Sequence, residues 1–274
     1  MVFGTVSVGS ISGRSMELVD LMERRRINIL CVQETKWKGE KAKEIGNGYK
    51  LFYYSTNNRR NGVGILLDPE MKKNELEVNR KSDRLMRVRI QVENRIINIV
   101  SAYAPQTGCE EEEKEEFWDN IERVIQNVPP SEVLRVGGDL NGHVGEGNTG
   151  SSECMGRHRV GIRNDDGDRI VDWETAGGMA LVNTYFMKLE QQKITYKSGN
   201  NNTQIDYIAC RRQQLKDGYS ETHTEDTLVE MEWKDVHIET SIMRRLALTP
   251  ERPSSYESKD YICNFTNVGH MYFV

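Results

Sequence analysis

The chain has 274 residues, of which 29% are charged and 37% hydrophobic, and its formal net charge is -5. It is long enough to bury a sizeable core. It contains no apolar run near the roughly 20 residues that cross a membrane, and its N-terminus shows no secretory signal. We therefore expect an intracellular monomer, nuclear or cytoplasmic, that is not secreted and binds no membrane. The acidic balance argues against nucleic-acid binding through bulk charge, although basic pairs such as Arg59–Arg60 remain available locally.

The five cysteines have no paired spacing, so neither a zinc site nor a disulfide framework is predicted. In the first half of the chain, Leu18, Leu21 and Met22 recur at helical spacing, with Ser12 or Ser15 as the expected cap. Apolar, β-rich runs separated by turn residues predict strands. These strands are residues 27–32 and 61–67, followed by a hairpin of residues 84–92 and 95–103.

The second half continues with alternating helices and strands. Residues 110–126 predict an amphipathic helix with an acidic first turn, which suits the positive end of the helix dipole. Residues 133–136 form a strand that runs into a polar turn, and a helix at 168–176 and strands at 180–186 and 203–209 follow. Hairpin-linked and helix-linked strands together indicate a layered α/β domain with a mixed sheet.

No linker interrupts this pattern, so we expect one domain over residues 1–245. Residues 246–274 are expected to be a C-terminal extension of uncertain order, because Pro250 and Pro253 disfavour a helix there.

Polar side chains stand where the predicted strands end, namely Glu34, Tyr103 and Asp139, while Asp206 lies inside the last strand. Such groups can meet in a crevice at one edge of a twisted sheet. Each has a structural alternative. Glu34 can cap a helix, Tyr103 can close a strand end, Asp139 can form an Asx-turn, and a buried Asp206 needs a hydrogen-bond partner.

Together the set suits phosphodiester hydrolysis. A hard cation such as Mg²⁺ prefers one or two carboxylates plus water and phosphate oxygens, and Glu34 can supply the protein ligand. Asp139 can orient or deprotonate the attacking water, and Asn141 can donate hydrogen bonds to the developing charge. Tyr103 can donate to a phosphate oxygen.

Several segments carry a family resemblance when they are taken in order. They are Gly13-Arg-Ser-Met-Glu-Leu18, Ile29-Leu-Cys-Val-Gln-Glu-Thr-Lys-Trp-Lys-Gly39, Asn61-Gly-Val-Gly64, Ser101-Ala-Tyr-Ala-Pro-Gln106, Gly138-Asp-Leu-Asn-Gly-His-Val-Gly-Glu-Gly-Asn-Thr-Gly150, Val182-Asn-Thr-Tyr-Phe186, Thr195-Tyr-Lys-Ser198 and Thr203-Gln-Ile-Asp-Tyr-Ile208. The chain resembles the endonuclease/exonuclease/phosphatase family. Within it, the motifs look most like those of LINE-type retrotransposon endonucleases and craniofacial development protein 2-like proteins.

The resemblance implies a DNase I-like fold, in which two mixed, largely antiparallel β-sheets pack as a sandwich flanked by helices. It also implies Mg²⁺ or Mn²⁺ as cofactor and DNA, contacted through its phosphate backbone, as partner. Glu34 matches the metal-binding glutamate, and Tyr103 the tyrosine that contacts the scissile phosphate. Asp139 and Asn141 match the Asp-x-Asn pair that positions water and stabilises the transition state. Asp206 matches the aspartate that orients a catalytic histidine.

Two positions depart from the family pattern. An asparagine that helps hold the metal site is replaced by Ser7, which predicts weaker metal positioning. The closing catalytic histidine has its candidate in His237, which follows Asp235, whereas His223 comes too early. His143 lies in the catalytic turn and is expected to line the site without being the base.

Three functions follow from these observations. The first is a divalent-metal-dependent phosphodiesterase, a retrotransposon-type endonuclease that nicks DNA. The second is a domesticated or catalytically impaired relative that retains the fold. The third is a phosphatase that uses the same core chemistry on a small phosphate ester.

Overall fold

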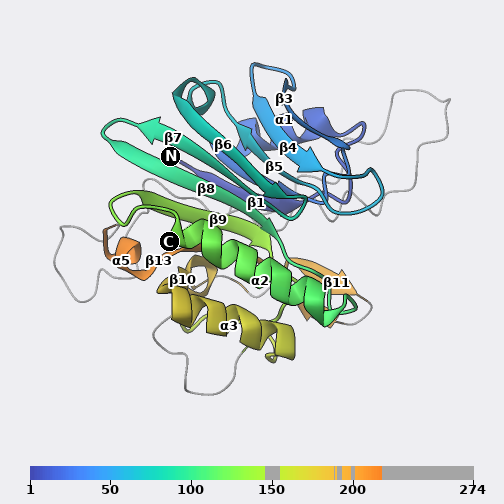
Figure 1. Cartoon of the computed structure of the whole chain (residues 1–274), viewed down its shortest axis with the longest axis vertical. Helices are drawn as coiled ribbons and strands as arrows, with labels where there is room; N and C mark the ends of the chain where they lie inside the picture. The colour runs from blue at the N-terminus through green and yellow to red at the C-terminus, as the bar shows by residue number, and fades with distance from the viewer. Residues whose placement is uncertain (146–154, 188, 190–192, 199–200, 218–274) are drawn as a thin grey trace.

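A computed structural model describes residues 1–145, 155–187, 189, 193–198 and 201–217. In it, two β-sheets carry the predicted site segments (Figure 1). The first sheet has five strands in the order β1-β2-β5-β4-β3, and only the β1–β2 pair is parallel. Its strands are β1 (Phe3–Ser7), β2 (Ile29–Gln33), β5 (Val63–Leu67), β4 (Lys50–Ser55) and β3 (Gly39–Glu44).

The second sheet has six strands in the order β10-β13-β9-β8-β7-β6, and its one parallel pair is β8–β9. Its strands are β10 (Met179–Leu181), β13 (Asp206–Arg211), β9 (Val133–Asp139), β8 (Arg95–Tyr103), β7 (Leu85–Val92) and β6 (Glu75–Ser82). A short hairpin joins β11 (Tyr196–Ser198) to β12 (Asn201–Thr203). Both large sheets are therefore mixed and largely antiparallel.

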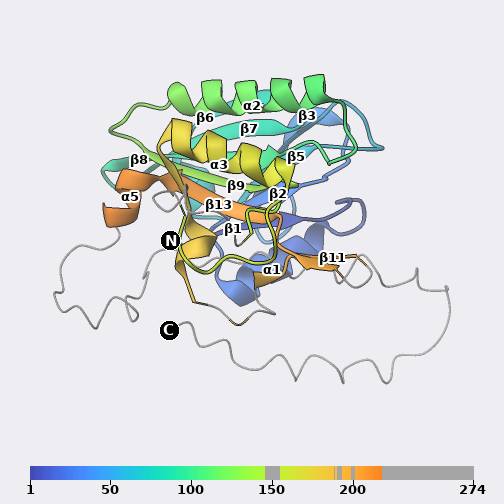
Figure 2. The ribbon, with the colours of Figure 1, turned by 90° about the horizontal axis from the view of Figure 1, so that it is seen from below.

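Three helices cover the outer faces of the two sheets, and Figure 2 shows α1 on the opposite side of the sheets from α2 and α3. They are α1 (Ser15–Arg25), α2 (Glu111–Gln126) and α3 (Asp165–Gly177). Shorter helical turns are η1 (Met71–Asn74), η3 (Val182–Tyr185) and α5 (Arg212–Asp217). No helix in the described part of the chain is long and apolar enough to cross a membrane.

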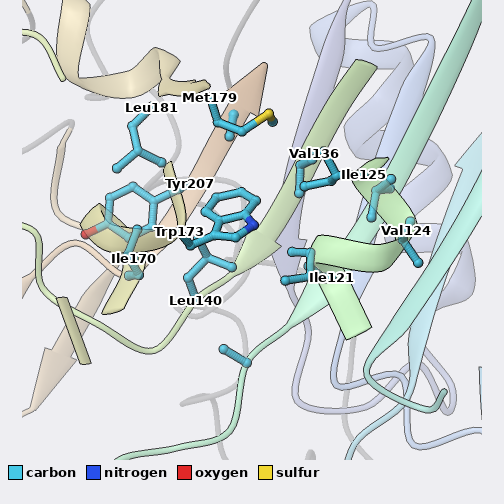
Figure 3. Packing of buried hydrophobic residues seen from close by; sticks show 14 of the residues in the cluster. Ile121, Val124, Ile125, Val136, Leu140, Ile170, Trp173, Met179, Leu181 and Tyr207 are labelled. Carbon is cyan, nitrogen blue, oxygen red and sulfur yellow. The ribbon is translucent and has the colours of Figure 1, made fainter. Parts of the chain in front are cut away.

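The buried core has three layers that match this sandwich. Side chains from both sheets form the central layer, which includes Phe3, Ile29, Ile65, Val88, Ile99 and Ile208. A second layer packs α2 and α3 against the six-stranded sheet, with Ile121, Val136 and Trp173 close together in Figure 3. A third lies beneath α1. Burying each large apolar side chain contributes about 1.5–3 kcal/mol. The sheets and these three layers confirm the predicted two-sheet sandwich flanked by helices.

Some predicted element boundaries are wrong. Neither Ser12 nor Ser15 caps α1, because Arg14 occupies the N-cap position and makes no side-chain cap hydrogen bond. Helix α3 begins at Asp165, three residues earlier than predicted, because Asn164 caps it. The strand expected at 180–186 ends at Leu181 and continues as η3, and the strand expected at 203–209 breaks between β12 and β13.

Asp206 is consequently the first residue of β13 and not an interior one. Strands β3, β4 and β6 were not predicted. Residues 218–274 lie outside the described part of the chain, so the domain boundary at residue 245 stays a prediction.

Candidate active site

Strand register brings the predicted site residues to one edge of the sandwich. Tyr103 and Asp139 are partners in the parallel β8–β9 pair, and Asp206 is the partner of Asp139 in the antiparallel β13–β9 pair. In the facing sheet, Ser7 is the partner of Gln33, which directly precedes Glu34. Residues separated by up to 199 positions are thereby adjacent.

A cavity of about 560 Å³ opens at this edge. The segments that line it come from β1, from the turns after β2, β8 and β9, and from the β11 hairpin. The lining residues with polar side chains include Ser7, Glu34, Gln106, Asn141, His143 and Tyr196.

Glu34 lines this cavity, and its backbone is strained. Its φ is 57°, a left-handed conformation that costs a side-chain-bearing residue about 1–2 kcal/mol. Its carboxylate is 20% exposed and lies 3.4 Å from the Lys36 ammonium. The segment that follows forms no helix, so the helix-capping interpretation of Glu34 is wrong. Strain at a cavity wall is typical of functional residues.

Gln33 fixes the neighbouring backbone from inside the sandwich. Its amide nitrogen donates to Ser101 Oγ at 3.1 Å and to the Gly137 carbonyl at 3.4 Å, and its oxygen accepts from Thr5 Oγ1 at 3.1 Å. These bonds tie β1, β2, β8 and β9 together directly behind Glu34.

Asp139 and Asp206 are fully buried behind the cavity wall. The Ser7 hydroxyl lies 3.0 Å from Asp139 Oδ2 and 3.4 Å from Asp206 Oδ1. Asp139 Oδ1 accepts from the Asn141 backbone N–H at 3.1 Å, so the Asx-turn is present. Asp206 lies within reach of the same hydroxyl, so both carboxylates contact the Ser7 side chain at the cavity wall.

Tyr103 is also buried, and Gln106, a residue of the cavity wall, donates to its phenolic oxygen at 3.4 Å. Burial raises the pKa of Tyr103, and the negative charges of Glu34 and Asp139 raise it further, while the Arg84 guanidinium near its ring opposes them. The phenol therefore keeps its proton and remains a hydrogen-bond donor at neutral pH.

Hydrogen bonds to three other parts of the fold fix the turn after β9. Asn141 adopts a φ of 48° and donates its side-chain amide to the Ala104 carbonyl at 2.8 Å. Asn164 accepts from the backbone N–H of His143 at 2.9 Å while it caps α3 by accepting from Gly167 at 2.9 Å. The Tyr207 hydroxyl lies 3.1 Å from the Gly142 carbonyl.

His143 lines the cavity from this turn, as the sequence predicted. Burial lowers the pKa of His143, and the charge of Asp166 partly offsets that effect. Asp166 itself pairs with Lys114 at 3.0 Å. A neutral imidazole keeps one N–H donor and one acceptor, and no described residue hydrogen-bonds to either ring nitrogen.

The structure thus brings five of the six predicted site residues together. Glu34 and Asn141 line the cavity, whereas Asp139, Asp206 and Tyr103 stand directly behind it. His237 and the alternative His223 lie outside the described residues. Sequence reasoning missed the roles of Gln33 and Gln106, which stand beside predicted residues in the quoted motifs and carry amides suited to buried hydrogen bonds.

The donor set fits a hard divalent cation. Within the described residues, no three His, Cys, Asp or Glu side chains group as metal ligands. Mg²⁺ keeps several waters and needs only one or two protein carboxylates when a substrate supplies phosphate oxygens. Glu34, half-buried at the cavity, offers one such carboxylate.

No family model matches the chain. Craniofacial development protein 2 of Bos taurus is 30% identical over 216 residues, which cover 77% of this chain and 36% of that protein. Its counterpart in Tragulus javanicus is 29% identical over 77% and 37% of the two chains. The chain therefore spans a little over a third of the length of these curated relatives.

Solved structures share the fold at low sequence identity. An AP endonuclease from Archaeoglobus fulgidus superposes with a TM-score of 0.59 at 19% identity, over 79% of this chain and 89% of that one. The endonuclease domain of TRAS1, a telomere-specific non-LTR retrotransposon, gives 0.51 at 16%, over 77% and 86%. The 3′ phosphatase NExo from Neisseria, bound to a product DNA hairpin, gives 0.55 at 13%, over 76% and 85%.

Proposed function

We infer from its DNase I-like fold and its 30% identity to craniofacial development protein 2 that the chain is a member of the endonuclease/exonuclease/phosphatase family. On that premise we propose that it is a divalent-metal-dependent phosphodiesterase that nicks DNA, as a retrotransposon-type endonuclease does. The observation that carries the proposal is the single cavity that Glu34 and Asn141 line, with Asp139 hydrogen-bonded to its wall.

Each residue at this cavity has a part suited to hydrolysis of a phosphodiester. Glu34 would hold Mg²⁺ or Mn²⁺, which supplies charge neutralisation at the phosphate. Asp139 serves as the acceptor for the proton of the attacking water. Asn141 uses one amide N–H to fix the turn, which leaves its second N–H to donate to the charge that develops on the phosphate.

Two further donors face or adjoin the same space. The Tyr103 phenol keeps its proton and can donate toward a phosphate oxygen, given a small shift of Gln106, which now bonds its oxygen. His143 presents a neutral imidazole N–H from the turn after β9. Asp206, buried beside Asp139, is the residue that would orient a closing histidine such as His237.

Local charge beside the cavity supports DNA as the substrate. The turn at residues 57–62 bonds to the segment that carries Glu34, since Lys36 N–H donates to the Asn61 carbonyl at 3.2 Å. Arg59 and Arg60 are exposed on that turn, and the Asn57 side chain holds both of their backbone N–H groups. These cations can contact backbone phosphates despite the net charge of the chain.

An impaired or domesticated relative is the second candidate function. It is favoured by Ser7, whose single hydroxyl stands where the family has an asparagine amide. Loss of a catalytic or stabilising group typically costs about 10²–10⁴-fold in rate. This alternative predicts that Ser7→Asn, combined with a histidine introduced near residues 233–237, raises nicking above wild type. A wild-type protein that is already fully active would rule it out.

A phosphatase that acts on a small phosphate ester uses the same chemistry, because the cavity residues recognise a phosphate and not a base. On the part of the surface that the structure describes, the basic turn at Arg59 and Arg60 favours DNA over a small phosphate ester. A panel of duplex DNA, inositol phosphates and nucleotides distinguishes them by relative kcat/KM.

The test of the proposed function is nicking of supercoiled plasmid DNA. We expect nicking in Mg²⁺ or Mn²⁺, none in excess chelator, and a loss of about 10²-fold or more in Asp139→Ala. Asp20→Ala, on an exposed face of α1, is the control and should nick like wild type. Equal nicking with and without chelator would refute the metal mechanism.

A further inference from the structure

Ser7 occupies the boundary between the cavity and the buried carboxylates. It is the last residue of β1, it is 4% exposed, and that small exposed part lines the cavity. Its hydroxyl is 3.0 Å from Asp139 Oδ2 and 3.4 Å from Asp206 Oδ1. A hydroxyl carries one proton, so at any moment it donates to one carboxylate, and Asp139 is the nearer acceptor.

Asp139 has no exposed surface, so a water molecule in the cavity reaches its carboxylate through intervening groups. Two groups that line the cavity bond to it, the Ser7 hydroxyl and the Asn141 backbone N–H. An amide N–H donates but does not accept. A hydroxyl does both, and can take up one proton as it releases another.

Building on the proposed function, we propose that the Ser7 hydroxyl relays a proton from the attacking water to Asp139. The water oxygen forms its bond to phosphorus and gives a proton to Ser7 Oγ. In concert, Ser7 passes its own proton to Asp139 Oδ2. The bond from phosphorus to the leaving oxygen breaks, and that oxygen takes a proton from solvent. The hydroxyl ends as it began, and Asp139 returns its proton to solvent through the Ser7 hydroxyl before the next turnover.

The relay gives Ser7 a role that an asparagine could not fill in this position. A side-chain amide can hold a water or a phosphate, but it does not readily exchange a proton between two oxygen atoms. The relay therefore predicts slower nicking by Ser7→Asn, whether or not a histidine is also introduced near residues 233–237. The impaired-relative hypothesis predicts faster nicking when the two changes are combined.

The experiment measures plasmid nicking in Mg²⁺ by wild type, Ser7→Ala, Ser7→Thr and Ser7→Asn, in ordinary and heavy water. We expect Ser7→Ala and Ser7→Asn to lower kcat by about 10²-fold with little change in KM. Ser7→Thr keeps the hydroxyl and should retain most of the activity. In wild type, the rate should curve with the deuterium fraction because two protons move together. In Ser7→Ala the dependence should become linear.

Thermal unfolding of each variant shows whether the fold is intact, and the deuterium dependence of wild type needs no variant. Full activity in Ser7→Ala, faster nicking in Ser7→Asn, or a linear dependence in wild type would each overturn the relay. In all three cases the phosphodiesterase itself would stand. If wild type fails to nick DNA with either metal, the proposed function fails, and the relay fails with it.

Discussion

Among the individual residues of the site, the carboxylates differ in burial and are therefore suited to different roles. Glu34 meets solvent in a strained turn, whereas Asp139 is sealed behind Ser7 and Asn141. Carboxylates in such unlike environments do not act alike. The half-buried Glu34 is suited to a cation, and the fully buried Asp139 to a proton.

Glu132 shows how another buried carboxylate supports the fold. It pairs with Arg89 and accepts from the Asn98 side chain at 2.8 Å, which links the segment after α2 to β7 and β8. The Arg89 hydrogen bond lowers the pKa of Glu132, more than desolvation opposes it, and Asn98 lowers it further. A carboxyl group whose pKa is lower in the folded than in the unfolded protein stabilises the fold when the pH is above the unfolded pKa. This stabilisation is lost as the pH falls through the folded pKa.

We therefore predict that Glu132→Gln reduces the acid sensitivity of the protein. The free energy of unfolding of wild type should fall as the pH drops below about 4.3, the ordinary value for glutamate. Urea unfolding measured across this range should show a shallower fall in the variant and lower stability at neutral pH. Glu77→Gln, which removes a more exposed partner of Arg87, is the matched control. Parallel pH profiles for Glu132→Gln and wild type would contradict the assignment.

At the element scale, the N-terminus of α3 anchors the catalytic turn. Asn164 caps the helix and holds the His143 backbone, and Gly142 packs so closely that a Cβ atom there would lie 2.7 Å from the Asp166 carbonyl. The Lys114–Asp166 ion pair joins the same helix end to α2. The turn is thus positioned by a helix that contributes no residue to the cavity wall.

Asn164→Ala should loosen this anchor. We expect a loss of about 1 kcal/mol in the free energy of unfolding from the missing cap. The backbone amide of His143, which is 2.9 Å from the Asn164 oxygen, should exchange its hydrogen faster. Nicking should slow through kcat. In the control Asn74→Ala, which removes an exposed donor on η1, the His143 amide should exchange as in wild type. If the His143 backbone amide exchanges its hydrogen at the same rate in Asn164→Ala as in wild type, Asn164 does not anchor the turn.

Burial explains why the sequence predicts some strands and misses others, although the largely buried β4 was missed as well. Strand β2 has its apolar side chains fully buried and could be predicted from residue type. Strand β3 is a sheet edge of charged, exposed residues that pairs through its backbone with β4, so it carries no apolar pattern. Strand β6 is likewise a largely polar edge. Hydrophobic periodicity does not reveal such polar edge strands.

The candidate site follows the same logic. The strand-end carboxylates were predictable because each follows an apolar run. The bond from Ser7 to Asp139 joins residues 132 positions apart and depends on how the two sheets pack, which no local pattern encodes. The sequence predicted a weakened metal site from Ser7, and the structure adds its two carboxylate contacts.

At the scale of the whole molecule, a protein with net charge -5 needs a local basic surface to hold DNA. Arg59→Gln with Arg60→Gln should weaken DNA binding. It should also reduce the slope of log affinity against log salt by about one unit for each phosphate that the variant no longer neutralises. Arg24→Gln with Arg26→Gln is the matched pair, because these exposed arginines precede β2, at the end of that strand away from Glu34.

Binding isotherms at several salt concentrations give both slopes. Equal slopes for the Arg59/Arg60 variant and wild type would place the DNA elsewhere on the surface.

The position of a bound divalent cation decides whether this cavity is a metal site. Crystals of the protein soaked in Mn²⁺ should show an anomalous scattering peak inside the cavity against the Glu34 carboxylate. The peak should disappear in Glu34→Gln and persist in Glu40→Gln, an exposed carboxylate on β3. A peak that lies outside the cavity, or that survives in Glu34→Gln, would contradict the assignment of this cavity as a metal-dependent phosphodiesterase site.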